Sequence, residues 1–292
     1  MTWSHNITLS PSQGDRILFW ILSVLAGLAG AIVLLILIFL VAEALPVLFN
    51  VGGAPFFFDP SWHPAGGLFN LIPMLLGTLL ATMGAVTLAT IFGISSALFS
   101  QYYAPSLLAS IYRKLIELLS GIPSVVFGFW GLMVLVPVIA RFHPPGPSLL
   151  AGIVILTLMI LPTIALVADA SLANVPREYL HGAAALGLRK WSIIRHVILP
   201  TAQSGLVTGI LLQTGRAIGE TMAILMVAGN VVQTPKSIFD PIRTLTSNIA
   251  LEMAYAVGDH RSALFLSGLL LLIMVVGLIF TADRITRYSQ HG

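Results

Sequence analysis

The sequence has no cysteine and few charged residues. None of its 292 residues is cysteine, which excludes disulfides and thiolate metal sites without identifying the compartment. Asp, Glu, Lys and Arg together make up 9% of the chain, whereas soluble domains contain about 25%. Because hydrophobic residues make up 57% of the chain and the mean hydropathy is +0.98, the composition predicts an integral membrane protein.

The features of an enzyme are also missing. The three lysines, Lys114, Lys190 and Lys236, do not follow the glycine pattern of a phosphate-cradling loop. The seven histidines are scattered, with no pair at ligand spacing on one helix, and we expect them at loops or interfaces. The chain is therefore predicted to be non-enzymatic, with no cofactor, metal or nucleic-acid partner of its own.

Six apolar runs are each long enough to cross a hydrocarbon core of about 30 Å at about 1.5 Å per residue. Each run is expected to be a helix, because unpaired backbone groups are too costly in lipid. The runs cover residues 17–41, 70–100, 115–140, 149–172, 201–232 and 262–282. The predicted fold class is all-α integral membrane protein, with about six transmembrane helices.

The placement of lysine and arginine predicts the orientation. With a cytoplasmic N-terminus, the inner segments hold nine of these residues and the outer loops four, while Arg216 lies inside the fifth run. Cytoplasmic segments are enriched in these residues, so both termini of this multi-pass protein are predicted to be cytoplasmic. The predicted division is an N-terminal segment 1–16, a first helix 17–41, an outer loop 42–69, a transmembrane domain 70–283 and a cytoplasmic tail 284–292.

A cleaved signal peptide is the competing interpretation of the first run, because Ala42-Glu43-Ala44 resembles a cleavage site. A signal core needs only about 7–15 apolar residues, and this run is longer, so a retained helix is preferred. The outer loops, 43–69 and 233–261, are rich in proline, glycine and aromatic residues, and neither could bury a core of its own. Phe56, Phe57, Phe58 and Trp62 are expected in an aromatic belt at the membrane interface, with a partner-docking surface as the alternative.

Segment 173–200 is the one polar interruption with a dense motif. Pro176 suits the first turn of a helix, and residues 182–185, Gly-Ala-Ala-Ala, give a face with little side-chain bulk. Gly187 can break that helix, and residues 190–197 resume in helical period. We expect a helix–turn–helix on the cytoplasmic side; an amphipathic linker on lipid headgroups is the alternative.

Arg216 and Glu220 lie inside the fifth run, four residues apart, and would share one face of a continuous helix. One interpretation is an ion pair that fixes helix packing, because a buried ion is costly unless paired. The other places Arg216 on a path for an oxyanion, with Glu220 holding the guanidinium when no anion is bound. Thr214 and Thr221 could add hydrogen bonds. Gly121-Ile122-Pro123-Ser124 is a second interruption, either a kink or part of the path.

Three segments together resemble the phosphate-specific permeases of ABC importers, the PstC type. They are residues 121–128, residues 179–200 and the run Gly215-Arg216-Ala217-Ile218-Gly219-Glu220-Thr221-Met222. The resemblance covers residues 66–283. The ATPase-coupling loop of such permeases reads Glu-Ala-Ala, three residues, Gly, nine residues, Ile, any residue, Leu-Pro. Here Gly187 and Leu199-Pro200 are in register, while His181 replaces the acidic residue and Glu178 lies one turn earlier.

The resemblance implies an ABC importer type I permease fold with a coupling loop over 173–200. It implies a second homologous permease of the PstA type, two copies of an ATPase subunit that uses ATP, and an extracytoplasmic phosphate-binding protein. The resemblance implies that Arg216 and Glu220 lie on the phosphate path, and the residues themselves add Thr214, Thr221 and Ser124 as path candidates. The implied coupling residues are Glu178, His181, Gly182, Ala183, Gly187, Leu199 and Pro200. Alternatives are a permease for another oxyanion (molybdate, sulfate or phosphonate), an ATP-independent carrier, or a membrane scaffold.

Overall fold

The computed structural model describes the backbone of residues 13–290 and the side chains of residues 14–280. The predicted end segments 1–16 and 284–292 therefore lie partly outside the described residues. Within the described part, six helical stretches are long and apolar enough to cross a membrane. They are Gly14–Asn50, Ile72–Tyr103, Ser124–Phe142, Leu149–Ala173, Lys190–Ile218 and Gly258–Phe280. The predicted all-α membrane fold class is confirmed.

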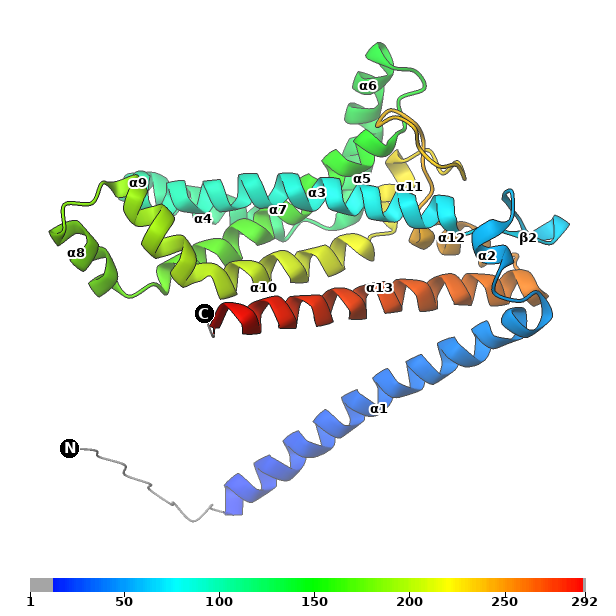
Figure 1. The fold of residues 1–292 in the computed structure, drawn as a ribbon, viewed down its shortest axis with the longest axis horizontal. Coiled ribbons are helices and arrows are strands. Elements are labelled where there is room, and N and C mark those ends of the chain that lie inside the picture. Colours follow the sequence, from blue (N-terminus) through cyan, green and yellow to red (C-terminus); the bar gives the residue numbers. More distant parts are fainter. Residues whose placement is uncertain (1–12, 291–292) are drawn as a thin grey trace.

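Two helices at the centre, α3 (Ile72–Leu98) and α7 (Leu149–Ala173), pack along each other (Figure 1). The buried face of α3 is made of small residues four apart: Ala81, Ala85, Ala89 and Gly93. A Cβ added at Gly93 would lie 2.8 Å from the Ile164 side chain of α7. Small side chains on one helix thus allow large ones on the other to fill the space between the two backbones.

The first helix, α1 (Gln13–Asn50), leaves this bundle. Figure 1 shows that it meets α13 (Gly258–Gln290) near the end of α1 and diverges toward its start. The Phe39 and Phe265 rings lie 5.5 Å apart at the meeting point. The described start of α1 and end of α13 point toward the end of the bundle that carries α8 (Arg177–Ala185) and α9 (Lys190–Ile193). The described ends of the first and last helices therefore lie on the same side of the bundle, and the cytoplasmic location of that side stays a prediction.

The third run differs from its predicted bounds of 115–140. Helix α4 (Ser106–Ser120) ends at Gly121, and the span begins at Ser124 with α5 (Ser124–Trp130), a π-helical turn (Gly131–Leu135) and α6 (Val136–Phe142). Pro123 explains the separation, because proline disfavours helical backbone in the residue before it. Helix α4 instead packs beside α7, where Arg113 Nε lies 3.0 Å from Asp169 Oδ2 in an ion pair without an aligned hydrogen bond.

The outer loops form one shared core at the opposite end from α8. We call this region the outer lobe: residues 51–71, α12 (Leu245–Glu252) and the first turns of α13. It contains α2 (Pro55–Phe58) and a two-stranded antiparallel sheet, β1 (Trp62–His63) paired with β2 (Leu68–Phe69). Its buried apolar side chains include Phe56, Trp62, Phe69, Leu71, Leu245 and Leu264.

The predicted aromatic belt is therefore wrong for Phe56 and Trp62, which are buried in the outer lobe. Phe57 and Phe58 stay exposed. Neither loop could enclose these rings alone, but residues about 190 apart in sequence do so together, as the Trp62–Glu252 contact illustrates. Local composition contains no information about such a pairing.

Candidate functional site

The fifth span is a broken helix. Helix α10 (Leu199–Ile218) ends before Gly219, and a new helix, α11 (Met222–Val227), begins after Thr221. The Glu220 carboxylate accepts a hydrogen bond from the backbone N–H of Ala223 at 3.1 Å, and the Thr221 hydroxyl donates to the Gly219 carbonyl at 3.2 Å. Side chains that bind nearby backbone groups compete with helix continuation, so the predicted unbroken run over 201–232 is wrong.

The break also separates Arg216 from Glu220. The described residues form four ion pairs, and Arg216 takes part in none of them. The predicted pair assumed four residues of continuous helix between the two charges, whereas helix α10 stops two residues before Glu220. Glu220 caps α11 instead, where a carboxylate at a helix N-terminus is favourable. Arg216 is left exposed on α10 in this single chain.

Arg216 is the last member of a row of exposed residues on α10. Counting back by fours, the row contains Leu212, Thr208 and Ser204, all exposed. Four-residue spacing places them on one face, which we call the open face of α10. The sequence reasoning missed Ser204 and Thr208, although their spacing from Arg216 was available as a signal.

The other predicted path residues lie elsewhere. Thr214 is half-buried and donates its hydroxyl to the Ile210 carbonyl within α10 at 2.8 Å. Thr221 lies in the break, and Ser124 is half-buried at the start of α5. The fold does bring α5 against α11, because a Cβ added at Gly128 would lie 2.7 Å from the Ala223 Cα. The segments 121–128 and 215–222, distant in sequence, thus belong to neighbouring helices.

Segment 173–200, which we call the inner loop after its predicted cytoplasmic location, is a helix–turn–helix, as predicted. Helix α8 ends at Ala185, Gly187 takes a left-handed φ of +73°, and α9 begins at Lys190. The backbone N–H of Gly187 donates to the Ala184 carbonyl at 2.9 Å. Helix α9 then continues through a π-helical turn (Ile194–Ile198) into α10, so the fifth span starts at Lys190 rather than at Pro200. This turn precedes Pro200, whose ring removes a backbone donor.

Some of the residues predicted to couple to an ATPase are buried against the bundle, and the others are exposed. Ala183 is buried and Leu199 half-buried, while Glu178, His181, Gly182, Gly187 and Pro200 are exposed. Beyond the turn, Ile194 and Ile198 are 1% exposed, whereas Trp191, whose helical spacing from both predicts the same side, is 59% exposed. Tyr179 and Leu186 are exposed as well. One side of the loop therefore packs on the bundle, and the other presents apolar side chains and the uncovered backbone of Gly182.

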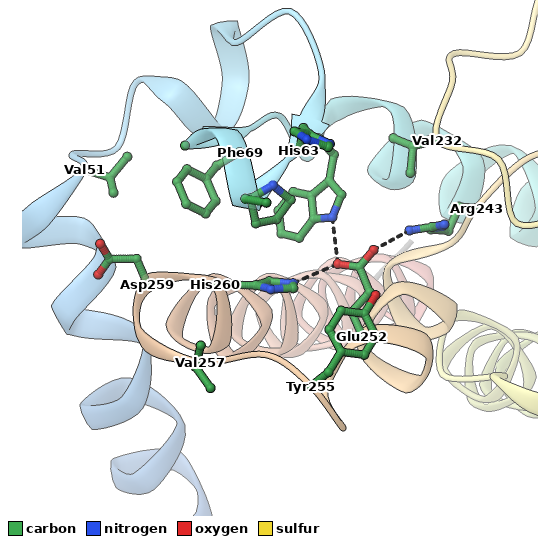
Figure 2. Close-up of a pocket in the computed structure, with 14 residues that line it drawn as sticks. Val51, His63, Phe69, Val232, Arg243, Glu252, Tyr255, Val257, Asp259 and His260 are labelled. Atoms are coloured by element: carbon green, nitrogen blue, oxygen red, sulfur yellow. Dashed lines mark hydrogen bonds and ion pairs between the residues drawn. The ribbon is translucent and has the colours of Figure 1, made fainter.

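A second polar cluster lies in the outer lobe, and no local sequence pattern predicts it. We call Trp62, Arg243, Glu252 and His260 the Glu252 cluster. Figure 2 shows the Glu252 carboxylate surrounded by three nitrogen groups. Arg243 Nη1 donates to Oε1 at 2.7 Å, Trp62 Nε1 donates to Oε2 at 2.9 Å, and His260 Nε2 lies 2.9 Å from Oε2. These residues line an open pocket of about 780 Å³.

Comparisons with known proteins give the same family as the three permease-like segments of the sequence. Residues 89–292 match the family described as "Binding-protein-dependent transport system inner membrane component". The chain is 38% identical over 247 residues to a probable ABC transporter permease protein, YqgH, of Bacillus subtilis, covering 82% of this chain and 80% of that protein. It is 34% identical over 260 residues to the phosphate transport system permease protein PstC of Haemophilus influenzae, covering 82% of each.

Solved structures give the fold. The MetNI methionine ABC transporter in an inward-facing conformation matches with a TM-score of 0.61 and 23% identity, covering 75% of this chain and 95% of that chain. A bacterial alginate ABC transporter in complex with an alginate-bound periplasmic protein matches with a TM-score of 0.66 and 13% identity, covering 94% of this chain and 96% of that chain. At these identities the likeness concerns architecture alone.

Proposed function

The chain belongs to the family of binding-protein-dependent transport system inner membrane components, and we propose that it forms the path for inorganic phosphate in an ATP-driven importer of the cytoplasmic membrane. Relatives that support the substrate are named phosphate transport system permease proteins and align over about four fifths of the chain. The structural observation that carries the proposal is the arginine left without an ionic partner on the open face of α10.

An unpaired guanidinium is costly against lipid, so the open face of α10 needs protein and water over it. We infer that a second, homologous permease covers this face and that the phosphate path runs between the two chains. Arg216 would bind phosphate oxygens with its two-donor fork, and Ser204 and Thr208 would supply hydroxyls along the same face. Glu220, held at the start of α11, would repel the anion and limit how long it stays.

Coupling to ATP hydrolysis would occur at α8 and α9. On these two helices and the turn between them, Tyr179, Leu186 and Trp191 are exposed, and a Cβ added at Gly182 would have nothing within 4 Å. This surface suits contact with a separate ATPase subunit, two copies of which would serve the permease pair. With the ATPase in the cytoplasm, both termini are cytoplasmic, and the outer lobe faces an extracytoplasmic phosphate-binding protein.

The test is uptake of labelled phosphate in cells that lack this chain, complemented with wild type, Arg216→Gln or Arg261→Gln. Arg261 is the matched control, because its guanidinium lies 3.7 Å from Glu43 at the outer end, away from α10. We expect wild type and Arg261→Gln to restore uptake and Arg216→Gln to fail at equal membrane levels. Full uptake with Arg216→Gln would refute the path role.

Two further arms separate the alternatives. If wild type restores uptake of molybdate or sulfate but not phosphate, the chain is a permease for another oxyanion. If Gly182, which lies on the open side of the loop, is replaced by a bulky residue and phosphate uptake persists, contact with an ATPase is not needed and an ATP-independent carrier is favoured. We expect the loop variant to assemble and to lose uptake, because the open side of the loop would no longer fit its partner.

A further inference from the structure

Helix α12 connects the two polar regions of the molecule. It has eight residues, Leu245–Glu252, and five of them are buried: the four residues of its first turn and Glu252 at its end. Its first turn reaches the break in the fifth span, and its last residue is the centre of the Glu252 cluster. A short buried helix with a hydrogen-bonded contact at each end can hold the two regions at a fixed separation.

At the first turn, Thr246 binds the break directly. Its Oγ1 donates to the backbone carbonyl of Glu220 at 2.9 Å. That carbonyl lies between α10 and α11, where it has no place in the hydrogen-bond ladder of either helix. Thr246 is 8% exposed, so water is largely kept away from this bond. The hydroxyl therefore satisfies a backbone group that a continuous helix would have satisfied itself.

The same turn is fixed on α3 as well. Thr78 Oγ1 accepts a hydrogen bond from the Leu245 N–H at 3.0 Å and donates to the Met74 carbonyl at 2.8 Å. Thr244 caps α12 by accepting from the Ser247 N–H at 3.2 Å, and its Oγ1 lies 3.0 Å from that of Thr246. Thr246 thus approaches Glu220 from a turn that is held by two other threonines.

At the other end, the outer lobe holds Glu252 through Trp62, Arg243 and His260. Arg243 also donates to the Asn230 carbonyl at 2.8 Å and to Asn248 Oδ1 at 3.0 Å, which ties α12 to the segment that follows α11. A displacement of the other parts of the outer lobe, residues 51–71 and the first turns of α13, would therefore be passed to α12, and through Thr246 to the break beside Arg216.

We propose that Thr246 is a positioning residue of the transport path: by donating to the Glu220 carbonyl it holds the break between α10 and α11 and links that break, through α12, to the outer lobe. The inference rests on the proposed function, in which the break adjoins the phosphate path. Loss of the donor leaves the Glu220 carbonyl without its partner and lets the residues between α10 and α11 shift relative to the outer lobe.

The experiment compares Thr246→Val, which keeps the shape and removes the donor, with Thr246→Ser, which keeps the donor. Thr87→Val is the matched control, because the Thr87 hydroxyl donates only within α3, to Met83 at 2.7 Å. Phosphate uptake and ATP hydrolysis are measured on the complete importer in proteoliposomes with its binding protein. We expect Thr246→Val to lower phosphate carried per ATP by about threefold to tenfold, the effect of one lost hydrogen bond, with Thr246→Ser and Thr87→Val near wild type.

A second readout follows the break itself. Since the chain has no cysteine, Met222→Cys places its single thiol at the first residue of α11, and Met222 is half exposed. We expect Thr246→Val to change the labelling rate of this thiol, and Thr246→Ser to leave it unchanged. Equal labelling rates and equal coupling in all variants would overturn the inference.

The two proposals fail in different ways. If the wild-type importer carries no phosphate but Thr246→Val still alters labelling at position 222, the proposed substrate is wrong and the positioning role stands. If the importer carries phosphate and Thr246→Val behaves like Thr87→Val in both assays, the proposed function stands and the positioning role is wrong.

Discussion

The Glu252 cluster and the open face of α10 differ in how their charged residue is buried and paired. Glu252 is 8% exposed and has a partner for each of its carboxylate oxygens, drawn from three separate segments. Arg216 is exposed and has no ionic partner among the described residues. The fold satisfies the charge of Glu252 within the chain. The charge of Arg216 has no ionic partner there, which is why we propose that a ligand or another chain approaches it.

The largest effect is expected when the carboxylate acceptor in the outer lobe, Glu252, is removed. Glu252→Leu leaves the Arg243 guanidinium without its carboxylate in a largely buried site, which costs about 3–5 kcal/mol when one partner of a buried pair is removed. We expect a large fall in the thermal stability of the purified transporter. Glu43→Gln is the control, because an exposed pair contributes only about 0–1 kcal/mol. Equal stability of the two variants would mean that the cluster does not hold the outer lobe.

The open face of α10 is tested by Arg216→Gln, which removes its exposed charge. Charge-assisted hydrogen bonds contribute about 1.5–3 kcal/mol, so phosphate uptake should fall by roughly tenfold to a hundredfold. Because Arg216 has no ion pair to lose, thermal stability of the transporter should stay near that of wild type. A variant that transports normally but unfolds early would assign Arg216 to the fold rather than to the path.

The contact between α5 and α11 offers a smaller test. Gly128→Ala places a Cβ 2.7 Å from the Ala223 Cα, and the overpacking should cost about 1–3 kcal/mol by pushing the two helices apart. We expect lower thermal stability together with reduced uptake. Gly268→Ala is the control, since its Cβ would meet only ordinary contacts at 3.7 and 3.9 Å. If both glycines tolerate alanine equally well, the close approach of α5 to α11 is not required.

The last test concerns the turn between α8 and α9 in the inner loop. Gly187→Ala forces alanine into a φ of +73°, at a cost of about 1–2 kcal/mol, confined to the turn between α8 and α9. ATP hydrolysis stimulated by the binding protein should fall more than membrane assembly does. Gly182→Ala adds a Cβ in open space within a helix, so any loss of ATP hydrolysis there would come from the partner contact alone. Unchanged hydrolysis in both variants would place the ATPase contact elsewhere.

Several elements could be predicted because their causes are local. The six spans follow from runs of apolar residues, and the turn at Gly187 follows from the one residue that takes a left-handed φ without strain. Ala183 was predicted on a small-residue face and is buried, while its neighbour Gly182 is open. The start of the fifth span was missed, because the π-helical turn before Pro200 lets the helix continue where a proline suggested a boundary.

The class of the protein, its six membrane-crossing helices and the positions of its polar interruptions follow from the amino-acid sequence, because hydrophobicity, glycine and proline act over a few residues. Which charged residues find partners depends on the tertiary structure. Arg216 and Glu220, four apart, are separated by a break that Glu220 itself caps and Thr246 holds from 26 residues away. Trp62 and Glu252, 190 residues apart, meet in a shared core. Whether two polar side chains pair depends on the distance between them in the folded chain. Packing between residues far apart in sequence sets that distance, and a local sequence pattern does not describe it.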